Sequence, residues 1–219
     1  MAQPSALPDA LRERISTAAP STLADAGPAL ATAALTSGAS DSGAFRAATA
    51  LRAASRELAQ AARDEAGAEA ATAALQLRFR ATQELLVAAV DRARAGTLDP
   101  EARSALTDGV TRWLDPYAID AAGEAVLAPW AEALRALPPV HQPDLEPVLQ
   151  AIEAARAAGR AWDRADPRRA AAIATRVATQ RSWAAALEAL VSRVGPGAWL
   201  DALNEAAPAA DPADDWFAD

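Results

Sequence analysis

The 219-residue chain contains no cysteine and no lysine, and it has a single histidine, His141. Without cysteine there is no disulfide framework, no thiolate nucleophile and no iron–sulfur cluster. Without lysine there is no Schiff base to pyridoxal phosphate and no P-loop lysine. One histidine cannot build a multi-histidine zinc site. These absences exclude many enzyme classes, and the sequence predicts no cofactor and no metal site.

Long hydrophobic runs are also missing. The longest uninterrupted apolar stretch is Leu85 to Val90, whereas a membrane-spanning helix needs about 20 such residues. Residues 1–10 carry no basic side chain and no apolar stretch follows them, unlike a secretory signal peptide. We therefore expect a cytoplasmic protein that has no membrane partner.

Alanine dominates what is present, with 66 of the 219 residues, and all 21 basic residues are arginine. Valine and isoleucine together supply only 13 residues. Alanine is the strongest helix former, while the β-branched residues that favour strands are scarce. The composition predicts an all-α protein, a helical bundle, and is typical of proteins encoded by GC-rich bacterial genomes.

The strongest pattern is a heptad repeat over residues 44–96, which predicts a coiled-coil-like helix. Alanine occupies five of the seven second seam positions, and small side chains let two helices approach closely. The register weakens near Gly67, where two antiparallel helices could meet, but we favour one long helix in close antiparallel contact within the chain or across an oligomer. The first seam positions are Ala44, Leu51, Leu58, Glu65, Thr72, Phe79, Leu86 and Ala93, and the second are Ala47, Ala54, Ala61, Ala68, Leu75, Thr82 and Ala89.

Start and stop signals divide the rest of the chain. Asp99-Pro100 reads as an aspartate cap followed by proline at the first helical position, and Asp166-Pro167 repeats this signature. Gly195-Pro196-Gly197 is a strong stop signal. We expect helices over residues 9–19, 21–36, 99–113, 120–137, 143–165, 166–194 and 198–206, with a loop at 37–43.

These elements suggest three segments: short N-terminal helices over residues 1–36, a helical bundle over 44–206, and an acidic tail over 207–219 whose composition predicts disorder. Within the bundle, the long helix 44–96 is followed by helices over 99–206 that contain tryptophan. All six tryptophans lie from Trp113 onward, so the later helices are expected to pack around large aromatic side chains.

Candidate catalytic groups are few. His141 lies in a proline-rich connection with no acid–nucleophile pair beside it, which is typical of a surface residue. Asp64, Glu65 and Glu69 cluster on a helix, but the chain has no Glu-x-x-His partner for a di-iron site. We interpret these acids as a solvated face, and we expect no enzyme activity.

An arginine row is the first candidate partner-binding feature. With only Asp163 and Asp166 among them, seven arginines give residues 156–181 a local charge of +5. Spacing by four places side chains along one ridge of a helix, where they could meet phosphates or an acidic partner. Alternatively the arginines pair within the helix, as Arg156 could with Glu153. The row consists of Arg156, Arg160, Arg164 and Arg168, joined by Arg169, Arg176 and Arg181.

The C-terminal segment is the second such feature. Residues 201–219 contain six acids and no arginine, and two adjacent aromatic residues, Trp216 and Phe217, follow Asp214 and Asp215. An acidic peptide with exposed aromatics is suited to a hydrophobic pocket ringed by basic residues. Trp216 could equally fold back onto the chain's own helices. The opposite charges predict that this tail docks on, or competes for, the arginine row.

These features favour a non-catalytic helical scaffold or adaptor that acts through protein–protein contacts, with the acidic-aromatic segment as a docking peptide. The alternative is a nucleic-acid-associated regulator that uses the arginine row. A steep loss of nucleic-acid affinity with rising salt would distinguish the second from the first.

Overall fold

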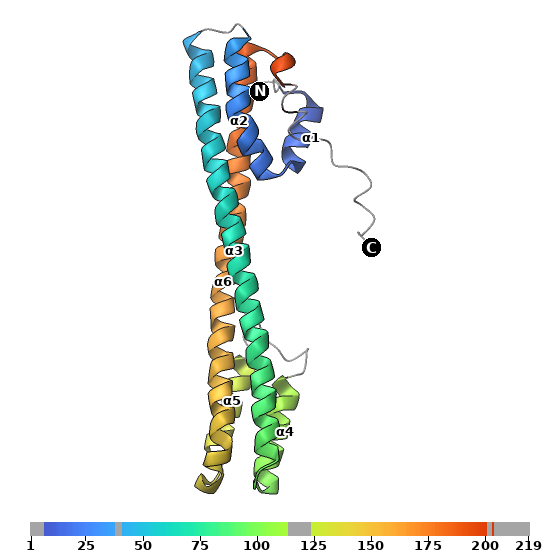
Figure 1. Cartoon of the computed structure of the whole chain (residues 1–219), viewed down its shortest axis with the longest axis vertical. Helices are drawn as coiled ribbons and strands as arrows, with labels where there is room; N and C mark the ends of the chain where they lie inside the picture. Colours follow the sequence, from blue (N-terminus) through green and yellow to red (C-terminus); the bar gives the residue numbers. More distant parts are fainter. Residues whose placement is uncertain (1–6, 38–40, 114–123, 201–202, 204–219) are drawn as a thin grey trace, which may run out of the picture. The chain divides into compact units, whose positions relative to one another are not determined.

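The computed structural model describes residues 7–37, 41–113, 124–200 and 203. Within this part of the chain there are six α-helices, two short 3-10 helices and no strand, which confirms the all-α class (Figure 1). The expected tail over residues 207–219, including Asp214, Asp215, Trp216 and Phe217, lies outside the described residues. None of the described helices is both long and apolar enough to cross a membrane.

Two of the helices, α3 and α6, are 53 residues long, and the others are much shorter. In chain order the elements are α1 (Asp9–Thr17), α2 (Pro20–Thr36), α3 (Ser42–Arg94), α4 (Pro100–Trp113), α5 (Glu124–Arg135), η1 (Pro139–His141), α6 (Gln142–Val194) and η2 (Ala198–Leu200).

The chain forms two compact units, and both long helices contribute to each of them. The first unit comprises Met1–Gly67 with Ala171–Asp219, and the second comprises Ala68–Ala170. This division differs from the single bundle expected over residues 44–206. The physical reason is that the buried side chains form two separate hydrophobic cores, one in each unit.

The first unit packs α1, α2, the N-terminal part of α3 and the C-terminal part of α6 around one core (Figure 1). Trp183 of α6 is fully buried, and its Nε1 donates a hydrogen bond to Ser55 Oγ on α3 at 3.0 Å. Helix α2 comes close to this pair at Gly27, where an added Cβ would lie 1.8 Å from Ser55 Oγ. Glycine is therefore required here for the helices to meet.

The second unit packs the C-terminal part of α3, α4, α5 and the N-terminal part of α6 around aromatic side chains. Phe79 of α3 meets Trp113 of α4 edge to face, with ring centroids 5.8 Å apart. Trp130 of α5 packs over Gly109 of α4 so closely that an added Cβ would lie 2.0 Å from the ring. The expected aromatic packing of the later helices is present in this core.

Helix α3 agrees with the heptad analysis. All fifteen seam positions are buried or partly buried, and Ala54 and Ala61 are 8% and 4% exposed. Gly67 lies inside the helix, where an added Cβ would meet nothing within 4 Å. The single long helix is thus confirmed, the alternative of a break at Gly67 is wrong, and the seam is buried against the chain's own helices.

Several boundary signals are confirmed. Asp99 Oδ1 accepts a hydrogen bond from the backbone N–H of Ala102 at 2.8 Å, which caps α4, and α4 is described as far as Trp113. Gly195 has φ +84°, and its N–H donates to the Val191 carbonyl at 2.7 Å where α6 ends. The expected helix over residues 120–137 is described only from Glu124.

The helix start expected at Asp166-Pro167 is wrong, because α6 runs without interruption through Pro167. A proline inside a helix loses one backbone hydrogen bond and costs about 3 kcal/mol. The helix on either side is held by buried residues, Ile152 in the second unit and Leu187 in the first, and each such side chain contributes about 1.5–3 kcal/mol. Tertiary packing therefore outweighs the local signal.

Candidate functional site

The first part of the arginine row is bound to acids of the second unit. Arg156 Nε contacts Glu124 Oε1 of α5 at 3.0 Å and Arg156 Nη1 contacts Glu153 Oε1 at 2.9 Å, while Arg156 Nη2 also pairs with Glu124. Arg160 Nη1 reaches Glu124 Oε2 at 3.2 Å, and Arg135 of α5 reaches Glu153 at 3.0 Å. These pairs join α5 to α6, so Arg156 and Arg160 serve the fold.

The titration behaviour agrees with this network. The hydrogen bond from Arg156 holds the pKa of Glu124 below its usual range, and the hydrogen bond from Arg135 does the same to the pKa of Glu153. The hydrogen bond to Glu124 in turn raises the pKa of Arg156. The charged forms are the favoured forms, which is the behaviour of structural ion pairs and not of a poised acid or base.

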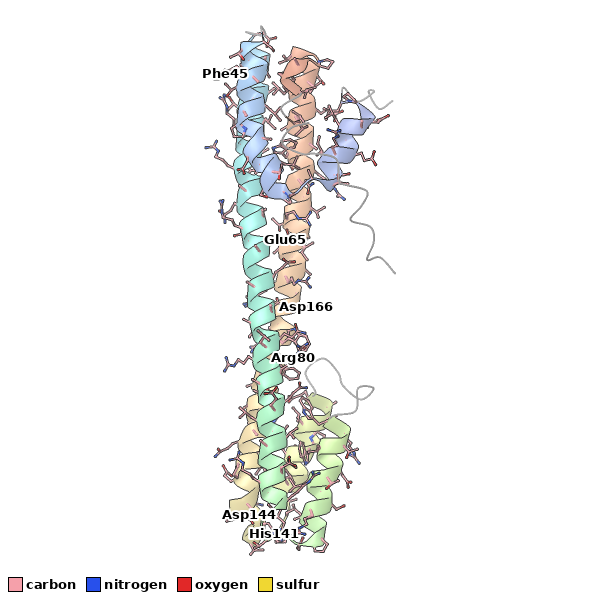
Figure 2. All side chains as sticks on the ribbon, turned by 45° about the vertical axis from the view of Figure 1, so that its right-hand side comes forward. Phe45, Glu65, Arg80, His141, Asp144 and Asp166 are labelled. Atoms are coloured by element: carbon pink, nitrogen blue, oxygen red, sulfur yellow. The ribbon has the colours of Figure 1, made fainter. Side chains whose placement is uncertain are left out.

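Two further arginines of the row pair with α3. Within the second unit, Arg169 Nη2 lies 3.7 Å from Glu69 Oε1. Within the first unit, Arg176 Nε donates to Glu65 Oε2 at 2.8 Å, and the Glu65 side chain is only 17% exposed (Figure 2). The interpretation of Glu65 as part of a solvated face is therefore wrong: it is a partly buried partner of α6.

Arg164 and Arg168 have a different environment. Both are exposed, and neither forms an ion pair with any residue that the structure describes. They lie beside a hollow of about 390 Å³ within the second unit, whose other lining residues are Ala68, Ala71, Thr72 and Leu75 of α3 and Ala161 and Ala165 of α6. The row is thus not one continuous free cationic ridge.

His141 is buried, so its interpretation as a surface residue is wrong. Its Nε2 lies 2.9 Å from Asp99 Oδ2, and the two residues are 42 positions apart in the chain (Figure 2). The pKa of Asp99 is lowered, first by the backbone hydrogen bond from Ala102 and then by the hydrogen bond with His141. The pair fastens the start of α4 to η1.

An apolar groove of about 510 Å³ lies within the first unit, between α1 and α6. Its volume falls in the range of about 300–1,000 Å³ that is usual for ligand pockets. Two arginines of its rim, Arg12 of α1 and Arg181 of α6, are exposed. The sequence analysis missed this groove, because only the folded chain brings α1 against α6. The apolar part of its lining consists of Leu7, Ile15, Val177, Ala184 and Ala185.

An exposed apolar stripe runs along α3 in the second unit. Leu77 and Leu85 are 65% and 60% exposed, two of the four large apolar side chains that are exposed among the described residues. Four exposed alanines continue the line in steps of three and four residues, so that all six side chains share one helix face. The stripe consists of Ala70, Ala74, Leu77, Ala81, Leu85 and Ala88.

Among the described residues, no group of three or more histidine, aspartate and glutamate side chains is arranged to hold a metal ion. Comparison with known proteins adds no family: no protein-family model, no curated protein and no solved structure matches this chain. The groove, the stripe and the unpaired arginines are therefore the features that point to its function.

Proposed function

We propose that this chain is a non-catalytic helical scaffold of the cytoplasm that works by binding other protein chains, and that the α3 stripe is its surface for a second copy. The exposed stripe carries the proposal. Helix α3 already buries one face in the core of its unit, whereas Leu77 and Leu85 lie on another face that is open to water. Contiguous exposed apolar side chains are characteristic of protein interaction surfaces.

The residue order along the stripe fits an antiparallel pair of identical helices. A twofold axis at the level of Ala81 places Leu77 of one copy at the level of Leu85 of the other, and small alanines separate the leucines. Arg80 and Glu84 lie on one flank of the stripe, four residues apart. In the antiparallel pair Arg80 of each copy therefore lies within about 3 Å, along the helix axis, of the level of Glu84 of the other, within reach of an ion pair. Figure 2 shows Arg80 on α3.

The expected affinity is modest. Complete burial of a leucine contributes about 1.5–3 kcal/mol, and these side chains are already partly covered. Four leucines in the pair therefore contribute roughly 4–8 kcal/mol, against an association cost of about 4–15 kcal/mol. The net binding free energy is then at most about 4 kcal/mol, so we expect a weak dimer with a dissociation constant of about 1 mM, which is already partly populated at several hundred micromolar.

Sedimentation equilibrium over a wide range of concentration tests the proposal. The Leu77→Glu, Leu85→Glu double variant should be monomeric at concentrations where the unsubstituted chain associates. Val140→Glu is the matched control, because Val140 is a 76% exposed apolar residue of the same unit outside the stripe. A monomeric unsubstituted chain at several hundred micromolar, or equal association of the double variant, overturns the proposal.

The nucleic-acid alternative has less support, since Arg156 and Arg160 are held by Glu124 and Glu153. Only Arg164 and Arg168 remain unpaired within the first five arginines of the row. Two phosphate contacts would give a shallow salt dependence, because the slope scales with the number of phosphates neutralised. A steep decline of DNA or RNA affinity with salt would instead favour the regulator.

A further inference from the structure

The groove between α1 and α6 has a largely apolar lining and three arginines, Arg12, Arg176 and Arg181, against one acid, Glu188 of α6, so its charge is net positive. Ile15 is buried and lines the α1 side, while Val177, Ala184 and Ala185 line the α6 side. Two polar groups of the lining already have partners: Gln180 donates to the Ile15 carbonyl at 2.7 Å, and the Ser16 hydroxyl donates to the Glu13 carbonyl at 2.6 Å. A ligand therefore needs to offer apolar surface to the lining and little hydrogen bonding to it.

The arginines on the rim of the groove differ in whether they already have a partner. Arg176 is occupied by Glu65 and Gln180. Arg12 and Arg181, by contrast, are exposed and form no ion pair with any described residue. One guanidinium comes from α1 and the other from α6, so the two sides of the groove each present a cation. The groove thus suits a ligand that combines aromatic or aliphatic surface with negative charge.

The chain's own segment 211–219 has this chemistry. Its sequence, DPADDWFAD, carries four aspartates and no basic residue, and Trp216 and Phe217 are adjacent. The opposite charges favour docking at the rim, while the two aromatic side chains supply the apolar surface for the lining. Exposed ion pairs alone contribute little and weaken with salt, so the aromatics should determine whether docking persists at physiological ionic strength.

The chain between Leu203 and Trp216 is long enough for Trp216 to reach the α1–α6 groove. Leu203 is fully buried and shares the core of the first unit with Val191 of α6. From Val191 to Arg176, near the far end of the groove, α6 rises about 22 Å over fifteen residues. The thirteen residues from Leu203 to Trp216 span up to about 45 Å when extended. Docking within one chain is therefore sterically possible without moving any helix.

We propose that residues 211–219 dock in the α1–α6 groove of the same chain, with Trp216 and Phe217 on the apolar lining and the aspartates at Arg12 and Arg181. This assignment narrows the expected docking site from the whole arginine row to its last member, Arg181, together with Arg12 of α1. The groove is then a peptide-binding site that the tail covers, and an acidic-aromatic peptide of another protein would have to displace the tail. The assignment does not rest on the α3 stripe, which lies in the other unit.

A labelled peptide with the sequence of residues 211–219 tests this site by fluorescence anisotropy. The chain truncated after residue 210 should bind the peptide at least tenfold more tightly than the full chain, in which the tail competes. Arg12→Glu with Arg181→Glu should weaken binding to the truncated chain at least tenfold. Arg164→Glu with Arg168→Glu is the matched control, with two unpaired arginines of the second unit, and should leave binding unchanged. A peptide in which alanine replaces Trp216 and Phe217 should lose binding at physiological salt.

Three outcomes overturn the proposal. The first is equal peptide affinity for the full and truncated chains. The second is that the Arg164, Arg168 control loses peptide binding while the Arg12, Arg181 variant keeps it. The third is tight binding of the alanine-substituted peptide at physiological salt. Amide hydrogen exchange on the full chain gives a second readout, because removal of residues 211–219 should raise exchange in α1 and leave α4 unchanged.

Discussion

The same substitution, glycine to alanine, should have opposite effects at Gly27 and Gly67. Both glycines lie inside α-helices, where alanine is preferred over glycine by about 1 kcal/mol. At Gly67 an added Cβ meets nothing within 4 Å, so only this local preference acts. Gly67→Ala should therefore stabilise the chain by about 0.5–1 kcal/mol.

At Gly27 the added Cβ would lie 1.8 Å from Ser55 Oγ and 3.0 Å from Trp183 Nε1. Ser55 cannot rotate away freely, because its hydroxyl donates to the Leu51 carbonyl at 2.8 Å and accepts from Trp183. Loss of that acceptor leaves a buried indole N–H unpaired, at about 1–3 kcal/mol. Displacement of α2 adds about 1–3 kcal/mol of overpacking. After the helix preference of about 1 kcal/mol is subtracted, Gly27→Ala should destabilise the first unit by roughly 1–5 kcal/mol.

Thermal unfolding followed by circular dichroism measures both effects. At about 4 °C per kcal/mol, Gly27→Ala should lower the melting temperature of the first unit by roughly 4–20 °C, and Gly67→Ala should raise it slightly. Tryptophan fluorescence should report the disturbance around Trp183. If Gly27→Ala is as stable as Gly67→Ala, the close contact of α2 with α3 and α6 does not exist and the reasoning fails.

Three other predictions address packing, charge and pH. Ala54→Leu with Ala61→Leu should destabilise the first unit by about 1–3 kcal/mol per site, because both side chains are buried in the seam. Urea unfolding with Ala50→Leu, at an exposed position of α3 in the same unit and outside the stripe, is the control. Arg80→Glu should weaken self-association, and adding Glu84→Arg should restore it, as sedimentation would reveal. The pKa of Glu124 lies below the usual 4.5 in the folded chain. The ionised carboxylate should therefore stabilise the fold at neutral pH, and this contribution should be lost as the pH falls below about 4.5. In urea unfolding, Glu124→Gln should reduce the dependence of the unfolding free energy on pH.

The long helix α3 could be predicted because the pattern that specifies it lies within its own sequence. A heptad seam repeats over seven turns of the pattern, and each leucine or alanine in it adds to the same helix face. Gly67 left two interpretations open, since one exposed glycine costs a helix only about 1 kcal/mol. Whether the chain continues or turns there depends on packing elsewhere along the helix.

The two Asp-Pro signatures show that a local sequence signal alone does not determine where a helix begins. Asp99-Pro100 begins α4, whereas Asp166-Pro167 lies within α6. Before Asp99 the chain leaves α3 in a turn, where the Gly96 N–H donates to the Ala93 carbonyl at 3.0 Å, but before Asp166 the helical pattern is uninterrupted. A missing hydrogen bond at Pro167 is tolerated when the helix on both sides is buried in a core.

The surfaces were harder to predict than the fold. Four-residue spacing correctly placed Arg156, Arg160 and Arg164 on one helix, but spacing cannot say which guanidiniums are already occupied. Glu124 pairs with Arg156 across 32 residues, and Glu65 pairs with Arg176 across 111. Such partners become visible only when the helices are assembled, so the unpaired arginines had to be found in the structure.

Helix α3 carries more apolar surface in the second unit than that unit uses. One face supplies Phe79 and Leu86 to the core. On a second face Leu77 and Leu85 are exposed to water, which lowers the solubility of the chain. A monomer gains nothing from the second face, since alanine or glutamine would form the helix as well. The stripe therefore makes physical sense as a binding surface, and the groove proposed to bind a peptide is separate from it, in the first unit.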